Sequence, residues 1–389
     1  MNHSPLQKTQ IAIVGAGIVG LAQARSFARR GYEVSVFERS QTAVGASIRN
    51  FGMIWPIGQP AGPRLEMALQ SREIWKAVAA EAGFFCSQEG SLHLAYHEDE
   101  WQILQEFWEA NHDGKGYEIE LLTPQATLQK SPAVKSKGLK GALLSHTEMI
   151  VDPREALAKI PSYLQEKYGV RFQFGQAVTH IEGLRFWAGG KPWEAEQMVV
   201  CSGVDFETLF PEKFAEKPIT KCKLQMMRTL PQPDGWRLGP SLCAGLTLLH
   251  YEAFADCPTL PLLRQRIAAQ MSQYLQWGIH VLVSQNGLGE IILGDTHEYG
   301  LHLDPFDKEY LNQWVLDYLE SFACFPQPFI AERWHGVYAK WPGQSAWVET
   351  VAPGIRLVNA LGGAGMTLSF GLAESQPEKK ELSQHPPID

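Results

Sequence analysis

The residues with the clearest chemical potential lie close to the start of the chain, where three glycines follow the spacing GxGxxG. The turn reads Gly15-Ala16-Gly17-Ile18-Val19-Gly20. The first glycine allows a tight turn, the second lets the backbone approach a phosphate, and the third lets a helix pack closely on a strand. A helix that begins at this turn offers free N–H groups and the positive end of its dipole. The turn therefore predicts binding of a dinucleotide pyrophosphate.

An acidic residue stands where a dinucleotide site needs one. Glu38 closes the next expected strand and can accept hydrogen bonds from ribose hydroxyls. We also expect its neighbour Arg39 to contact the cofactor. A glycine turn without a ligand would not require this acidic residue at this place.

A second glycine-rich turn lies near the other end of the chain and reads Gly362-Gly363-Ala364-Gly365-Met366-Thr367. It follows an expected strand at 355–358 and precedes an expected helix at 367–374, so it can hold another anionic group. Reduced flavin carries negative charge that such a helix start stabilises. One cofactor that touches both ends of the chain is typical of FAD. The cofactor residues expected here are Gly363, Gly365, Met366 and Thr367.

The elements that must position these turns can be read from the sequence. A strand at 10–14, a helix at 18–30 and a strand at 33–37 form a β-α-β unit around the first turn. A loop rich in glycine and proline at 49–62 is long enough to serve a site. Further helices are expected at 65–82, at Glu98–Asn111, at 151–168 and at Glu309–Phe322. Strands are expected at 170–174, 177–181, 197–201, 223–229, 280–284 and 290–293.

Composition excludes several classes of protein. The 389 residues carry a formal net charge of −8 without a basic stripe, which argues against nucleic acid as the main partner. No apolar run is long enough to span a membrane, and the polar start has no signal-peptide core. The six cysteines and twelve histidines are scattered, without a CxxC or HExxH motif, so no bound metal is expected. Free thiols favour a cytoplasmic location, and the polar end of the chain at 377–389 is expected to be a flexible tail.

The order of these segments resembles the FAD-dependent D-amino-acid oxidase superfamily, which includes glycine oxidase and sarcosine oxidase. The similarity covers IAIVGAGIVGLAQARSFARRGYEVSVFER, GALLSHTEMIVDPREALAKI, GVRFQFGQAVTHIE, MVVCSG and RWHGVYAKWPG…PGIRLVNALGGAGMTLSFGLAE. It implies an α/β (α+β composite) fold, with a Rossmann-like FAD domain around a mixed or parallel sheet and a substrate domain around an antiparallel sheet. The implied FAD domain spans 8–83, 141–216 and 329–376, and the substrate domain spans 84–140 and 217–328.

The resemblance also implies particular cofactor contacts. Val178 would contact the adenine end through its backbone, and Ser202 and Gly203 would pass near the ribose and pyrophosphate. The loop residues Ser47, Arg49 and Asn50 would line the stretch from pyrophosphate to flavin, where an arginine can neutralise phosphate or reduced flavin.

The sequence departs from the family at the substrate end. Amino-acid oxidases of this group carry a GxRP-like stretch whose arginine pairs with the substrate carboxylate, whereas here Tyr338 stands at that place. A tyrosine cannot form a bidentate ion pair. Lys340 would face the same side of the strand and could bind an anionic group or assist oxygen reduction. We therefore take Tyr338 and Lys340 as candidate catalytic residues, and the alternatives are a core tyrosine and an exposed strand lysine.

Two further comparisons with family patterns concern the flavin. Sarcosine oxidases hold flavin through a cysteine shortly after this stretch, but 339–351 contains no cysteine, so we expect non-covalent FAD. The run Gly294-Asp295-Thr296-His297 resembles the GDxxH motif of flavin monooxygenases. No glycine turn follows it closely, so we interpret 290–295 as a strand of the substrate domain.

These observations predict an oxidoreductase that removes hydride from a small primary or secondary amine, with O2 as the expected acceptor. Substrate candidates are an amino acid, an N-methyl amine or an aminophosphonate. The last follows from ASIRNFGMIWPIGQPAG, which resembles a branch associated with phosphonate breakdown. Arg49, Lys223, Arg228 and Lys340 are the cations that could bind a phosphonate. The alternatives are a dehydrogenase with another electron acceptor, a flavin monooxygenase, and a flavin-binding protein without catalysis.

Overall fold

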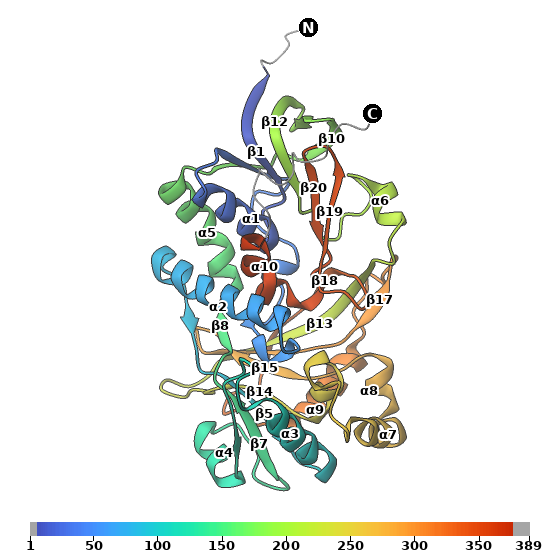
Figure 1. Cartoon of the computed structure of the whole chain (residues 1–389). Helices are drawn as coiled ribbons and strands as arrows, with labels where there is room; N and C mark the ends of the chain where they lie inside the picture. The colour runs from blue at the N-terminus through green and yellow to red at the C-terminus, as the bar shows by residue number, and fades with distance from the viewer. Residues whose placement is uncertain (1–5, 376–389) are drawn as a thin grey trace.

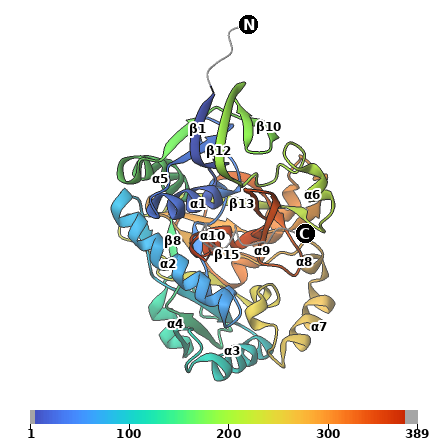
Figure 2. The same cartoon turned by 45° about the horizontal axis from the view of Figure 1, so that its top comes forward.

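The computed structural model of the protein describes residues 6–375, and the tail expected at 377–389 lies outside them (Figure 1). Two large sheets organise this part of the chain. The sheet around the first glycine turn has eight strands, and the other has nine. Both views of the ribbon place β1 (Gln7–Val14) and β12 (Lys191–Val200) of the eight-stranded sheet in the upper half, away from the lower half that contains α3 (Glu98–Asn111), α4 (Pro124–Lys130) and α7 (Leu260–Gln270) (Figures 1 and 2).

The eight-stranded sheet has a parallel centre. β1 runs parallel to β12 on one side and to β2 on the other, so that Ile13 lies opposite both Val199 and Val36. β9 and β20 add further parallel pairs, and β10, β11 and β19 join antiparallel at the edges. The strands are β1 (Gln7–Val14), β2 (Val34–Glu38), β9 (Arg171–Phe174), β10 (Val178–Glu182), β11 (Arg185–Ala188), β12 (Lys191–Val200), β19 (Trp347–Ala352) and β20 (Ile355–Asn359).

Four helices gather beside this sheet, namely α1 (Ile18–Arg29), α2 (Pro63–Ala82), α5 (Pro153–Tyr168) and α10 (Gly365–Glu374). α10 packs against both α1 and α2, so segments from the first and last parts of the described residues meet (Figure 1). The contact is fixed by the fully buried Trp75, whose indole N–H donates to the carbonyl of Met366 at 2.8 Å. This packing is what brings the two glycine turns to one place.

The helix expected from residue 151 begins at Pro153 because Val151 is the last residue of a strand. Val151 pairs with Cys86, and Asp152 then caps the helix by accepting the N–H of Arg154 at 2.9 Å. A proline in the first turn and a left-handed glycine at the end, Gly169 with φ 69°, complete the start and stop signals.

The nine-stranded sheet is antiparallel apart from the parallel pair β14–β5, which confirms the expected second sheet. Its strands are β5 (Ser91–Ala95), β6 (Ile119–Leu122), β7 (Gly141–Ser145), β13 (Thr220–Pro231), β14 (Ser241–Cys243), β15 (Leu282–Gln285), β16 (Glu290–Gly294), β17 (Glu298–Gly300) and β18 (Ile330–Lys340). The remaining helices are α3 (Glu98–Asn111), α4 (Pro124–Lys130), α6 (Pro211–Ala215), α7 (Leu260–Gln270), α8 (Ser272–Gln276) and α9 (Glu309–Phe322). The sequence did not predict α4, α6, α7 or α8.

Short elements join the two sheets. A three-stranded sheet combines β3 (Met53–Ile54), β4 (Cys86–Ser87) and β8 (Met149–Val151). The 3-10 helices are η1 (Ala46–Ile48), η2 (Pro56–Gly58), η3 (Gly245–Leu249), η4 (Glu252–Phe254) and η5 (Gly362–Ala364).

β7 and β18 complete the nine-stranded sheet although both lie within the segments assigned to the FAD domain. The sheets therefore cross the expected domain boundaries, and the division itself remains a proposal.

Candidate functional site

The first glycine turn sits between the ends of β1 and β12 and the start of α1. Gly15 has φ +101°, and a Cβ there would lie 2.4 Å from the carbonyl oxygen of Cys201. A Cβ on Gly20 would lie 1.9 Å from the carbonyl oxygen of Gly15. Because a side chain is excluded at both positions, the spacing of these glycines is explained by close approach of backbone to backbone.

The entrance to α1 is held by side chains from neighbouring segments. Glu38 accepts the N–H of Ala16 and the N–H of Ser40, each at 2.9 Å. The hydroxyl of Ser47 accepts the N–H of Ile18 at 3.0 Å, and a Cβ on Gly17 would lie 3.1 Å from that same oxygen. The expected residues 15–20, Glu38 and Ser47 thus form one compact group around the start of the helix.

The second glycine turn forms η5 and the start of α10. A Cβ on Gly363 would meet the hydroxyl oxygen of Tyr338 at 3.5 Å, so Tyr338 points at this turn from β18. The hydroxyl of Thr367 accepts the N–H of Trp55 at 2.9 Å and is buried. Thr367 therefore holds the 49–62 loop against α10.

A cavity of about 440 Å3 joins these parts. Most of the expected cofactor residues line it, namely Gly15, Gly17, Ile18, Val19, Gly20, Glu38, Arg39, Ser47, Arg49, Asn50, Val178, Ser202, Gly203, Gly363, Gly365 and Met366. Ala16, Thr367 and Lys340 do not line it, whereas Tyr338 does. A continuous cavity from the first turn past Val178 and Ser202 to the second turn fits one extended dinucleotide.

One cavity residue was not expected there. Asp295, at the end of β16, lines the cavity with Tyr338, and its Oδ1 atom has no hydrogen-bond partner. Burial raises the pKa of the Asp295 carboxyl well above its usual value, and burial also raises the pKa of Tyr338 well above 10. The phenol therefore stays protonated near neutral pH. The only sequence signal for Asp295 was the GDxxH-like run.

That run belongs to the substrate sheet, as interpreted from the sequence. β16 (Glu290–Gly294) pairs with β13 and β15, and Asp295 follows it directly. His297 is buried, and this burial lowers its pKa to about 4. Its ring lies beside the rings of His250 and His280. No short sequence motif predicted this grouping.

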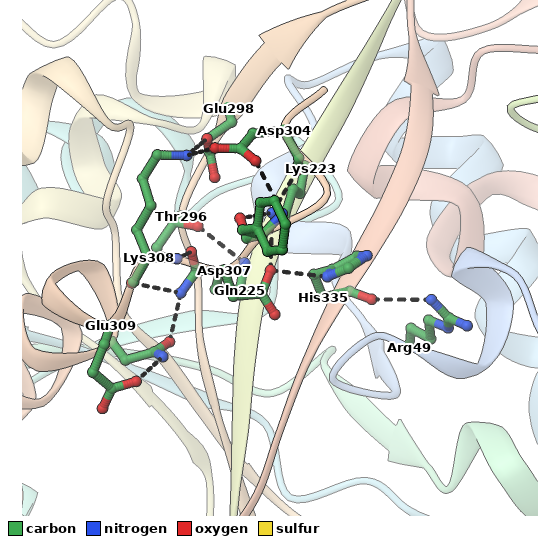
Figure 3. A network of polar contacts seen from close by, with 12 residues as sticks. Arg49, Lys223, Gln225, Thr296, Glu298, Asp304, Asp307, Lys308, Glu309 and His335 are labelled. Carbon is green, nitrogen blue, oxygen red and sulfur yellow. Dashed lines mark hydrogen bonds and ion pairs between the residues drawn. The ribbon is translucent and has the colours of Figure 1, made fainter. Parts of the chain in front are cut away.

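The four candidate cations differ in how they are paired. Lys223 is buried and bound to Asp307 at 2.9 Å, and it donates to two backbone carbonyls, as Figure 3 shows. Arg228 is bound to Glu290 at 3.2 Å and also to Glu332.

Arg49 and Lys340 are less constrained. The Arg49 guanidinium donates to the carbonyl of His335 at 3.3 Å (Figure 3). The Lys340 ammonium lies 5.6 Å from the centre of the Tyr299 ring. Neither forms an ion pair within residues 6–375, so these two remain available to an anionic ligand.

The remaining expectations concern cysteine and apolar contacts. All six cysteines are free, and Cys201 lines the cavity at the first turn. The apolar side chains of Phe51, Leu224 and Met226 also line it.

Within residues 6–375, no helix combines the length and apolar character needed to cross a membrane.

The comparisons with known proteins agree with this geometry. The model of the family described as FAD dependent oxidoreductase (DAO) matches residues 10–375. The chain therefore belongs to this family of FAD-dependent oxidoreductases, which confirms the resemblance drawn from the sequence and FAD as the cofactor.

Individual relatives are distant. A glycine oxidase from Geobacillus kaustophilus (strain HTA426) is 30% identical over 144 residues, which is 34% of this chain and 37% of that protein. One of the subunits of an opine oxidase from Rhizobium meliloti is 23% identical over 239 residues, which is 58% of this chain and 64% of that protein. Both matches thus span less than two thirds of the relative.

The crystal structure of an L-proline dehydrogenase from P. horikoshii superposes with a TM-score of 0.74 at 21% identity, and covers 95% of this chain and 92% of that one. This likeness shows the fold.

Proposed function

We propose that this protein oxidises a small primary or secondary amine that carries an anionic group. When bound, the flavin supplies the acceptor for the hydride removed from the carbon next to nitrogen. The observation that carries the proposal is the composition of the cavity wall beside the second glycine turn. There the Tyr338 hydroxyl and the Asp295 carboxyl share the cavity with Leu224 and Met226.

The side chains at this place suit an amine. The amine must be neutral to release hydride, and an ionised carboxylate can accept a hydrogen bond from an amine and take up its proton. Asp295 offers an unpartnered oxygen for this purpose. The protonated Tyr338 hydroxyl can donate to the substrate, and the apolar wall excludes water from the reacting carbon.

The anionic group would be bound in an unusual way for the family. Tyr338 replaces the expected arginine, and Lys223 and Arg228 are already paired with carboxylates. The unpaired Arg49, which lines the cavity, would therefore recognise the anion. Lys340, which lies outside the lining but close enough to Asp295 for its charge to oppose the effect of burial on the pKa of that carboxyl, would assist it. An amino acid, an N-methyl amine with an acidic group and an aminophosphonate remain substrate candidates, and we favour the aminophosphonate because a dianion suits two separate cations.

Steady-state oxidation of N-methylated aminophosphonates, measured beside sarcosine, glycine and D-alanine, tests this proposal. We expect the aminophosphonates to give the highest kcat/KM. Turnover of glycine or D-alanine alone would exclude the phosphonate, and failure of every amine would exclude the amine oxidoreductase.

The electron acceptor is proposed to be O2, and the alternative is a dehydrogenase. The relatives include both a glycine oxidase and, by fold, an L-proline dehydrogenase. Reoxidation of the reduced flavin in air separates the two, since very slow reoxidation excludes an oxidase. We further propose a cytoplasmic location because all six cysteines are free.

A further inference from the structure

Three histidines that lie far apart in the sequence come together beside the cavity. His250 follows η3, His280 precedes β15, and His297 lies between β16 and β17. One ring nitrogen from each lies within 4.8 Å of the others. Imidazole nitrogens at such spacing can share one metal ion if their lone pairs converge.

The hydrogen bonds of these rings leave nitrogen atoms without a protein partner. His280 is 2% exposed, and neither of its ring nitrogens has a hydrogen-bond partner. His297 is also buried, and its Nδ1 lies 2.8 Å from the carbonyl oxygen of Gly278. When Nδ1–H donates to that carbonyl, the Nε2 lone pair is left free. Histidine ligands in metal sites are oriented in this way by a backbone carbonyl.

A carboxylate completes the cluster. Asp295 Oδ2 lies 3.6 Å from His280 Nε2 and 3.8 Å from His297 Nε2. Ligand atoms about 2.0–2.1 Å from a tetrahedral metal lie about 3.3 Å from one another. The rings of His250 and His280 are stacked with their centres 3.6 Å apart, so these rings must turn and the ligand atoms must move closer together to bind one ion. A buried polar group without a partner requires an explanation, and a ligand shared by these side chains provides one.

We propose that His250, His280, His297 and Asp295 bind one divalent transition-metal ion of the zinc type. Imidazole nitrogen suits zinc and its neighbours in the first transition row, whereas oxygen-only sites suit magnesium and calcium. An anion fits less well because the acidic side chain of Asp295 is part of the cluster. His250 is exposed and gives the ion a path of entry.

The position of this site ties it to the cavity without depending on the proposed substrate. Asp295 lines the cavity, so the ion would stand at its wall. The sequence predicted no metal because it contains no CxxC or HExxH motif, and these four residues form none. The proposed site is assembled from three segments that only the folded nine-stranded sheet brings together.

Zinc binding to the full-length, FAD-loaded protein tests the proposal. The protein is first dialysed against a chelator and then equilibrated with zinc chloride, and bound zinc is measured by elemental mass spectrometry. We expect one zinc per chain in the wild type. His280→Ala and His297→Ala should weaken binding at least about 10-fold, since even partners outside the coordination shell cost that much. His180→Ala, on an exposed position of β10, serves as the matched control and should bind like the wild type.

The His250→Ala variant distinguishes the loss of a metal ligand from the loss of structure that the buried variants could cause. Because this ring is exposed, its truncation should preserve FAD content and circular dichroism while it weakens zinc binding. The proposal is overturned if the wild type retains no zinc. It is also overturned if folded His250→Ala and His280→Ala proteins retain as much zinc as the wild type.

Discussion

A single methyl group at Gly17 should weaken cofactor binding while the fold remains intact. Gly17 has φ −69°, which alanine adopts freely, so Gly17→Ala introduces no backbone strain. Its Cβ would lie 3.1 Å from the hydroxyl oxygen of Ser47, and both residues line the cavity. The new methyl group therefore either displaces Ser47 or occupies space that the pyrophosphate needs.

The size of the effect follows from the cost of overpacking. Inserting a methyl group into a well-packed site costs about 1–3 kcal/mol. Since each 1.4 kcal/mol changes an affinity about tenfold, the Kd for FAD should rise about 5- to 150-fold. Without FAD, the free energy of unfolding should change by less than about 0.5 kcal/mol, because the only close neighbour is a hydroxyl that can rotate.

Fluorescence titration of the apoprotein with FAD measures this Kd, and urea unfolding measures the stability. The double variant Gly17→Ala with Ser47→Ala is the matched control. If the defect arose from displacement of Ser47, the second substitution would restore binding. We expect no restoration, because the cofactor itself should meet the methyl group. A wild-type Kd for Gly17→Ala would refute the assignment of this turn to the pyrophosphate.

Three further substitutions test the substrate end. Tyr338→Phe should reduce kcat/KM about 10- to 100-fold at unchanged FAD content, because it removes one hydrogen bond to a charged substrate, and a wild-type value would remove Tyr338 from the site. Lys340→Met should raise the KM for an anionic amine about 10-fold and leave the KM for an uncharged amine unchanged. The exposed Lys191→Met serves as the control, and equal effects on both amines would contradict a role of Lys340 in anion binding. Lys223→Met should lower the free energy of unfolding by about 1–3 kcal/mol without changing KM, because this buried lysine is bound to the partly exposed Asp307. An altered KM with unchanged stability would instead assign Lys223 to substrate binding.

Most of the residues expected at the cofactor line one cavity, and their positions follow from local signals. The positions of Gly15 and Gly20 depend on a turn, a strand and a helix that follow one another in the chain. Glu38 closes the next strand. Each of these is visible in a short window, and the family resemblance extended the same logic to the turn around Gly363.

The substrate end could not be predicted in the same way because it depends on pairing between distant strands. Asp295 reaches the cavity only because β16 pairs with β13 and β15. The large side chains Trp55, Met53, Trp334 and Trp341 lie in or near the segments expected at the site, yet none of them lines the cavity. The apolar wall comes instead from Phe51, Leu224 and Met226. Burial alone does not tell a core aromatic from one in a site.

Secondary structure was also predicted where the sequence signals are local and missed where they are not. Amphipathic helices such as α3 and α9 have the bounds expected from their periodicity. Helix α7 was missed, although it begins with a proline in its first turn, because its apolar residues do not form a clear stripe. The first residues of α5 were misplaced because a strand runs directly into its cap.

Anaerobic mixing of the FAD-loaded protein with an N-methylated aminophosphonate tests the central claim most directly, with the visible flavin absorption as the readout. We predict complete bleaching of the flavin band by this amine, and none by the corresponding hydroxyphosphonate, in which oxygen replaces nitrogen. Rapid bleaching by the hydroxyphosphonate, with no change on addition of any amine, would contradict amine oxidation at this site.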